Sequence, residues 1–206
     1  MKITLESLEQ LAWEKQSGMI PAIVQDAGSG ILLMQAYMDK EALKITLQSG
    51  LVTFFSRSRE SIWQKGETSG NSLKLVEVAA DCDGDSLKIL AVPTGPVCHL
   101  GTSTCWDEGA QPDLTFFAEL ESVIEERKGT DPKRSYTALL QDRGIKYISQ
   151  KVGEEAVETA LAAVAGDQKE FLNESADLLY HLLVLLNAKG LSLGKVAKVL
   201  RERHQA

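Results

Sequence analysis

The chain has 206 residues, of which 44% are hydrophobic and 25% are charged, a composition typical of globular proteins. The formal net charge of −7 argues against a nucleic-acid-binding protein, because neutralising phosphates requires clustered lysine and arginine. The sequence has no apolar run long enough to span a membrane, and residues 1–6 lack the features of a signal peptide. We therefore expect a cytoplasmic protein with no membrane or nucleic-acid partner.

The first half of the chain is predicted to be rich in β-strands. Short hydrophobic runs between clusters of Gly, Asp and Ser predict strands at 20–24, 31–37, 51–55, 73–79 and 87–92. One helix is expected at 39–48, with Asp39 as its N-cap and Gly50 after its end. This half is therefore predicted to form a β-rich α+β domain.

From Asp113 onward the hydrophobic spacing becomes helical. Intervals of 3, 3 and 4 residues separate Leu114, Phe117, Leu120 and Ile124. Further helices are expected at about 135–141, 145–165, 168–188 and 192–204. The polar segment 107–112 contains Gly and Pro and is the best boundary between domains. We expect a first domain at 1–107, a linker at 108–112 and an all-α helical bundle at 113–206.

Three aspartates alternate with other residues in the segment Asp81-Cys82-Asp83-Gly84-Asp85. In an extended chain their carboxylates would project to one side and the Cys82 thiol to the other. Carboxylate oxygens suit a hard cation such as Mg²⁺, whereas thiolates suit Zn²⁺. One short segment could therefore serve two metals on opposite faces.

All three cysteines of the chain lie between positions 82 and 105. An odd number of cysteines in a reducing compartment does not suit disulfides. Cys82, Cys98 and Cys105 supply three thiolates, which would leave a zinc ion an open position for water, unless His99 is a fourth ligand. The alternative is that these are three buried, inert cysteines.

Four motifs follow one another in the first half: Phe55-Ser56-Arg57-Ser58-Arg59, Trp63-Gln64-Lys65-Gly66-Glu67-Thr68-Ser69-Gly70-Asn71, the aspartate segment, and Gly95-Pro96-Val97-Cys98-His99-Leu100-Gly101-Thr102-Ser103-Thr104-Cys105. Together they resemble phosphoribosyl-AMP cyclohydrolase over residues 20–106. The resemblance implies that the cysteines bind zinc and that Asp81, Asp83 and Asp85 bind magnesium. It also implies a homodimer whose zinc ligands come from both subunits, and hydrolytic opening of the adenine ring between N1 and C6.

The roles of the remaining motif residues stay open. His99 is a candidate proton shuttle, because imidazole titrates near neutral pH, or a structural histidine that orients its loop. The other polar residues are candidate substrate ligands or solvated surface residues: Arg57, Arg59, Lys65, Thr68 and Ser69.

Two predicted helices of the second half carry carboxylates at helical spacing. Glu154, Glu155 and Glu158 fall within about 100° of arc, and Glu174 and Asp177 share a face at i and i+3. Antiparallel helices joined near Gly166 would bring both groups together, where like charges beside an apolar core need a cation between them. Taken singly, each of these residues is more often a solvated surface group.

This pattern, E-E-x-x-E followed by E-x-x-D, resembles the metal-binding signature of the MazG-like nucleotide pyrophosphohydrolases. Within that group, segments 151–158 and 173–181 resemble phosphoribosyl-ATP pyrophosphatase. The resemblance implies that the five carboxylates hold Mg²⁺ while water cleaves between the α- and β-phosphates. It leaves open whether Glu155 or Glu158 acts as general base, and it makes Lys151 a candidate phosphate ligand. His181 is expected to be a satisfied core or interface histidine.

The two resemblances together imply a bifunctional hydrolase of histidine biosynthesis with small phosphoribosyl-nucleotide substrates. The C-terminal domain would act first, because its product, phosphoribosyl-AMP, is the substrate of the N-terminal domain. Two alternatives are a general nucleotide pyrophosphohydrolase fused to a different zinc hydrolase, and a metal-stabilised binding protein without activity. Mn²⁺ could replace Mg²⁺, and Fe²⁺ could replace Zn²⁺.

Overall fold

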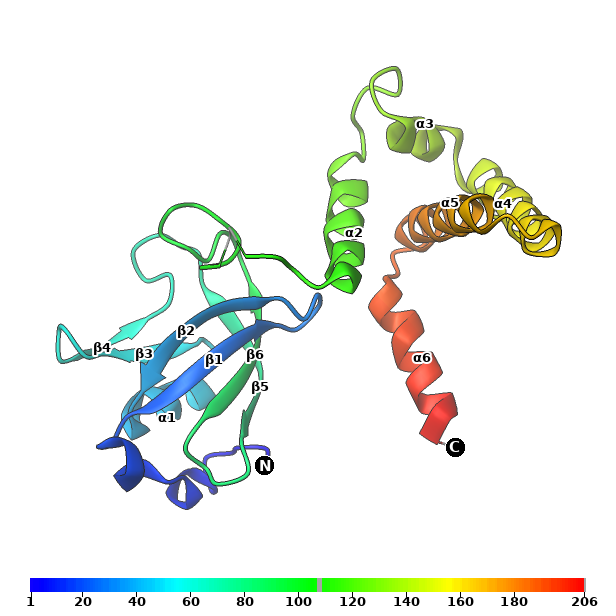
Figure 1. Cartoon of the computed structure of the whole chain (residues 1–206). Helices are drawn as coiled ribbons and strands as arrows, with labels where there is room; N and C mark the ends of the chain where they lie inside the picture. The colour runs from blue at the N-terminus through cyan, green and yellow to red at the C-terminus, as the bar shows by residue number, and fades with distance from the viewer. Residues whose placement is uncertain (107–108, 206) are drawn as a thin grey trace. The chain divides into compact units, whose positions relative to one another are not determined.

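The computed structural model of the chain describes residues 1–106 and 109–205 (Figure 1). Contacts divide the chain into two compact units, Met1–Thr115 and Phe116–Ala206. The first unit is strand-rich and the second is helical, as the sequence predicts. The predicted domain boundary at residues 107 and 108 lies outside the described residues.

The first unit is built on a six-stranded sheet with the order β4-β3-β2-β1-β6-β5. Its strands are β1 (Ile20–Asp26), β2 (Leu32–Met38), β3 (Thr53–Ser56), β4 (Ser61–Gln64), β5 (Leu73–Ala80) and β6 (Leu87–Pro93). Neighbouring strands are antiparallel except β1 and β6, which are parallel. The sheet curls back on itself, because Leu51, just before β3, forms a bridge with Lys74 of β5.

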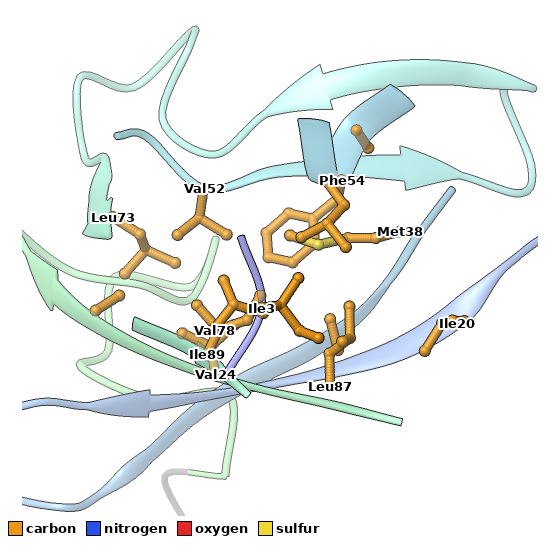
Figure 2. Close-up of a cluster of buried hydrophobic side chains, with 14 of the residues drawn as sticks. Ile3, Ile20, Val24, Met38, Val52, Phe54, Leu73, Val78, Leu87 and Ile89 are labelled. Atoms are coloured by element: carbon orange, nitrogen blue, oxygen red, sulfur yellow. The ribbon is translucent and has the colours of Figure 1, made fainter. Parts of the chain in front are cut away.

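One helix, α1 (Lys40–Ser49), connects β2 to β3. The Asp39 side chain caps it by accepting a hydrogen bond from the Ala42 N–H, and Gly50 ends it with a left-handed φ of 72°. The strands direct their apolar side chains into one core, where Met38, Phe54 and Ile89 meet (Figure 2). Burying a side chain of this size stabilises the fold by roughly 1.5–3 kcal/mol.

The N-terminal segment, residues 1–19, packs along the edge of this sheet. It contains two short 3₁₀ helices, η1 (Leu8–Gln10) and η2 (Trp13–Gln16), which the hydrophobic pattern does not predict. The Ile3 N–H donates to the Val78 carbonyl of β5 at 2.9 Å. Leu8 and Leu11 are buried in the core of the first unit. The segment is therefore an integral part of this unit.

The second unit contains α2 (Phe116–Glu126), α3 (Tyr136–Arg143), α4 (Ile145–Ala165), α5 (Gln168–Ala188) and α6 (Leu193–Gln205). The chain reverses between α4 and α5 at Gly166, whose φ of 83° is left-handed, and Asp167 caps α5. The core of this unit is formed by Ile124, Leu140, Ile148, Leu183 and Val184. In the part of the chain that the structure describes, every helix is too short or too polar to cross a membrane.

Candidate active sites

The three alternating aspartates, Asp81, Asp83 and Asp85, lie in the turn between β5 and β6, not in the extended chain that strand alternation predicts. The Asp81 carboxylate accepts hydrogen bonds from the N–H groups of Asp85 at 3.1 Å and Ser86 at 3.3 Å. Gly84 adopts a left-handed φ of 74°, which bends the chain. The bend brings carboxylate oxygens of Asp81, Asp83 and Asp85 within 4.8 Å of one another. We call Asp81–Asp85 the acidic turn.

Lys15 contacts this turn, although the sequence analysis did not single it out. Its Nζ lies 2.7 Å from an oxygen of Asp83 and 3.6 Å from an oxygen of Asp85. The hydrogen bond between Lys15 and Asp83 raises the pKa of the lysine and lowers that of the carboxyl group. The two residues are 68 positions apart, so no local pattern could have revealed the pair.

Within one chain, the three cysteine thiols lie at two separate positions. Cys98 and Cys105 are neighbours, whereas Cys82 lies in the acidic turn with its sulfur 3.9 Å from an Asp83 oxygen. Across the described residues, no cluster of three potential ligands within 4.8 Å includes a cysteine. Cys82 and Cys105 are exposed and Cys98 is half-buried, so the reading of three buried, inert cysteines is wrong.

The environments of the paired thiols differ. A hydrogen bond from the Leu100 backbone N–H lowers the pKa of the Cys98 thiol. Cys105 is exposed as a residue, but partial desolvation of its thiol raises the pKa, and the neighbouring Cys98 raises it further. His99 is exposed, and its Nδ1 lies 3.8 Å from the Cys98 sulfur. A thiol with a lowered pKa and an imidazole therefore lie side by side, with the imidazole exposed.

The predicted substrate residues lie in two turns that flank β4. Arg57 and Arg59 are in the turn before it, and the Arg57 guanidinium lies 3.9 Å from the centre of the Tyr37 ring. Lys65, Thr68 and Ser69 are in the turn after it. All except Lys65 are exposed, and Lys65 is half-buried.

Two glycines let the turn after β4 pack closely. A Cβ added at Gly66, whose φ is 89°, would lie 2.4 Å from the backbone carbon of Asn71. A Cβ at Gly95 would lie 2.4 Å from the Asn71 side-chain oxygen. The second and fourth sequence motifs therefore meet at Asn71, which explains why both contain glycine.

In the second unit, carboxylate oxygens of Glu155, Glu158 and Glu174 lie within 4.8 Å of one another. The first two are on α4 and the third is on α5, so the antiparallel helices do bring acidic residues together. Glu155 is 5% exposed. Burial raises the pKa of Glu174, and the carboxylates of Glu158 and Glu155 raise it further. Converging acidic groups of this kind attract a divalent cation.

Two of the five predicted carboxylates lie outside that cluster of three. Glu154 accepts hydrogen bonds from Lys151 at 2.8 Å and Gln150 at 2.7 Å, and the Lys151 bond lowers its pKa. Lys151 also lies 3.0 Å from Glu155, and its own pKa is raised by the two glutamates. Asp177 is exposed on α5, one turn after Glu174.

Tyr136 and His181 adjoin the cluster. His181 is 4% exposed, and its Nδ1 donates to the Asp177 carbonyl at 2.9 Å. The Tyr136 hydroxyl, at the start of α3, lies 3.1 Å from His181 Nε2. The histidine is thus satisfied and buried, as expected from the sequence. Its spacing of four residues from Asp177 was the one signal that it shares a face with the acidic residues.

Comparison with known proteins places these two units in known families. The family model for phosphoribosyl-AMP cyclohydrolase matches residues 34–107, and that for phosphoribosyl-ATP pyrophosphohydrolase matches residues 117–204. The two matches define a fusion of two hydrolases.

Relatives that align with nearly the whole chain are named as bifunctional proteins, in agreement with the two family matches. The chain is 56% identical over 197 residues to the histidine biosynthesis bifunctional protein HisIE of Photobacterium profundum, covering 93% of this chain and 95% of the relative. It is 54% identical over 203 residues to the protein of the same name from Escherichia coli, covering 98% and 100%. The chain belongs to this family of bifunctional enzymes of histidine biosynthesis. The predicted bifunctional hydrolase is thereby confirmed.

Proposed function

We propose that the C-terminal domain hydrolyses phosphoribosyl-ATP to phosphoribosyl-AMP and pyrophosphate, and that the N-terminal domain then opens the adenine ring between N1 and C6. The domains would be 1–107 and 113–206, with 108–112 as the linker. The observation that carries this proposal is the pair of separate carboxylate clusters, one in each unit, each with three oxygens within 4.8 Å. Each cluster has the oxygen ligands that Mg²⁺ prefers.

In the N-terminal domain, Asp81, Asp83 and Asp85 would hold Mg²⁺, and the three cysteines would hold Zn²⁺. Three thiolates suit zinc and leave one position for water, whose pKa the metal lowers to near 7. The separation of exposed Cys82 from the pair Cys98 and Cys105 within one chain supports a zinc site shared between two subunits. We therefore propose a homodimer with two such sites.

His99 would move a proton during ring opening, since it is exposed and lies beside Cys98. The five residues in the turns around β4 would bind the phosphate and ribose of the substrate: Arg57, Arg59, Lys65, Thr68 and Ser69. Arginine forks suit phosphate oxygens, and the hydroxyl groups can donate hydrogen bonds.

In the C-terminal domain, Glu155, Glu158, Glu174 and Asp177 would hold Mg²⁺, with Glu154 at the edge of the site. Glu155 is buried and lies beside Lys151, which suits a fixed ligand. Glu158 is exposed, so one of its carboxylate oxygens could hold Mg²⁺ while the other accepts a proton from the attacking water. Lys151 would contact the phosphates. Mg²⁺, when bound, supplies positive charge that neutralises them.

A helical dimer of the MazG-like type would cover an apolar face of the second unit. Large side chains of α4 and α5 are exposed there although they are hydrophobic: Val157, Leu161, Val164, Leu172 and Leu179. Faces of this kind are typical of subunit interfaces. We further propose a cytoplasmic location, because three free thiols suit a reducing compartment.

The test follows both reactions with the full chain, phosphoribosyl-ATP and Mg²⁺. We expect pyrophosphate release and a change in ultraviolet absorbance as the ring opens. Stripping zinc with a chelator should stop the reaction at phosphoribosyl-AMP. Intact phosphoribosyl-ATP, with ordinary nucleoside triphosphates cleaved instead, would refute the assignment.

A further inference from the structure

The N-terminal segment holds the acidic turn by its backbone. The Ala12 N–H donates to the Gly84 carbonyl at 2.9 Å. The two segments are in van der Waals contact, since a Cβ added at Gly84 would lie 3.4 Å from the Ala12 nitrogen. Ala12 and Lys15 precede residue 34, where the match to the cyclohydrolase family model begins, whereas the acidic turn lies within it. A part of the chain outside that match therefore touches the proposed magnesium ligands.

This attachment also fixes where Lys15 lies. The residue belongs to η2, whose first residue, Trp13, donates its indole N–H to the Leu8 carbonyl at 2.8 Å and packs against the core. Lys15 Nζ then lies 2.7 Å from Asp83 Oδ2 and 3.6 Å from Asp85 Oδ2. The packing of η2 against the core thus positions Lys15, which contacts Asp83 and Asp85 but not Asp81.

We propose that Lys15 is a built-in counter-ion of the acidic turn, which competes with the divalent cation for Asp83 and Asp85 and so sets its affinity. This inference rests on the proposed role of Asp81, Asp83 and Asp85 as metal ligands. An ammonium group and a metal ion cannot both occupy the space between the same carboxylate oxygens, since two positive charges at such distances repel.

The competition has a definite direction. Without a metal, Lys15 offsets the repulsion among the three carboxylates and keeps the turn in its bent shape. A divalent ion brings twice the charge and can reach all three carboxylates, so it displaces the lysine. Removing the Lys15 ammonium group should therefore increase the affinity of the acidic turn for the metal ion. Since exposed ion pairs are weak, we expect metal binding about three- to tenfold tighter.

The experiment measures Mn²⁺ binding by electron paramagnetic resonance, because the signal of the free ion falls on binding. The parent protein is the full chain with Glu155→Gln and Glu158→Gln, which removes the proposed C-terminal site. Lys15→Gln and Lys15→Met are compared with two controls. Lys15→Arg keeps the charge, and Lys2→Gln removes another exposed lysine, whose Nζ lies 3.4 Å from Glu77.

We expect Lys15→Gln and Lys15→Met to lower the Mn²⁺ dissociation constant about three- to tenfold, with both controls within about twofold of the parent. Thermal unfolding checks that each variant is folded. Equal or weaker binding in both uncharged variants would overturn the inference about Lys15. Failure of the parent to bind Mn²⁺, or binding that survives Asp83→Asn, would instead overturn the proposed metal site.

Discussion

His181 Nδ1 on α5 lies 3.7 Å from the Oε1 oxygen of Glu155 on α4, and both side chains are buried. Lys151 Nζ, on α4, lies 3.0 Å from the same oxygen. The Glu155 carboxylate therefore has a nitrogen-bearing side chain from each of the two helices as a neighbour. A buried acidic group fixed in this way is preorganised for a cation.

Replacing Glu155 with glutamine should abolish most pyrophosphatase activity. The substitution keeps the size of the side chain but removes the charge at the centre of the proposed site. We expect pyrophosphate release to fall by at least about 100-fold, with ring opening of supplied phosphoribosyl-AMP unchanged. The control is Glu202→Gln, an exposed glutamate on α6. Unchanged pyrophosphate release would remove Glu155 from the site.

Tyr136→Phe tests whether the neighbouring hydrogen bonds position Glu155. The change removes only the hydroxyl that lies 3.1 Å from His181 Nε2. We expect kcat for pyrophosphate release to fall about tenfold with KM little changed, since an outer contact orients a ligand without binding substrate.

Tyr180→Phe is the matched control for that variant. Its ring also packs edge-on against His181, but its hydroxyl is hydrogen-bonded to Thr137 at 2.8 Å, whereas the Tyr136 hydroxyl lies next to His181 Nε2. It should reduce stability by about 0.5–1.5 kcal/mol and leave kcat unchanged. Equal kinetic losses in both tyrosine variants would point to a general structural effect.

Mixing inactive subunits tests the shared zinc site. Cys82→Ser and Cys105→Ser should each abolish ring opening. In a mixed dimer one site lacks both ligands, but the other combines an intact Cys82 with an intact Cys98 and Cys105. Random pairing makes half of the dimers mixed, each with one of two sites intact. Co-refolding should therefore restore about one quarter of the wild-type activity. No recovery would mean that each site lies within one chain.

Glu125 should make stability depend on pH. This α2 residue accepts hydrogen bonds from Lys128, in the turn that follows α2, and from Asn187 on α5, and the Lys128 bond is the main cause of its lowered pKa. A carboxyl group with a depressed pKa in the folded state stabilises the fold at higher pH and loses this effect on protonation. Glu125→Gln should thus lower the unfolding temperature at pH 7, and the difference should shrink as the pH falls below 4.5, the group's ordinary value. A difference that stays constant down to acidic pH would contradict this explanation.

Local rules predicted the helices well. The bounds of α4 and α5 match because their ends are set by neighbouring residues, Gly166 and the Asp167 cap. Strand β4 was missed because Ser61–Gln64 has only four residues and no alternation of burial. Short elements of this kind are fixed by their pairing partner, here β3, which the local pattern does not show.

The sequence predicted which residues form the two candidate sites better than it predicted how those residues are arranged. Alternating aspartates fit a strand and a turn equally well, and the left-handed Gly84 decides for the turn. Helical spacing placed Glu154 with Glu155 and Glu158, but its carboxylate lies outside the cluster and is hydrogen-bonded to Gln150 and Lys151. Lys15 depends on a contact between distant parts of the chain, so periodicity and motifs could not reveal it.

The parallel pairing of β1 with β6 makes the first unit depend on a contact between distant parts of the chain. The acidic turn joins adjacent strands, so its hairpin needs only a short loop closure. In contrast, Ala22 pairs with Leu87, so β1 remains without this partner until β6 has been made, and the pairing then closes a much longer loop. The proposed magnesium ligands can thus gather through a local closure, whereas the pairing of β1 with β6 needs a long-range one. Translation reaches the helices of the second unit only after β6 has been made.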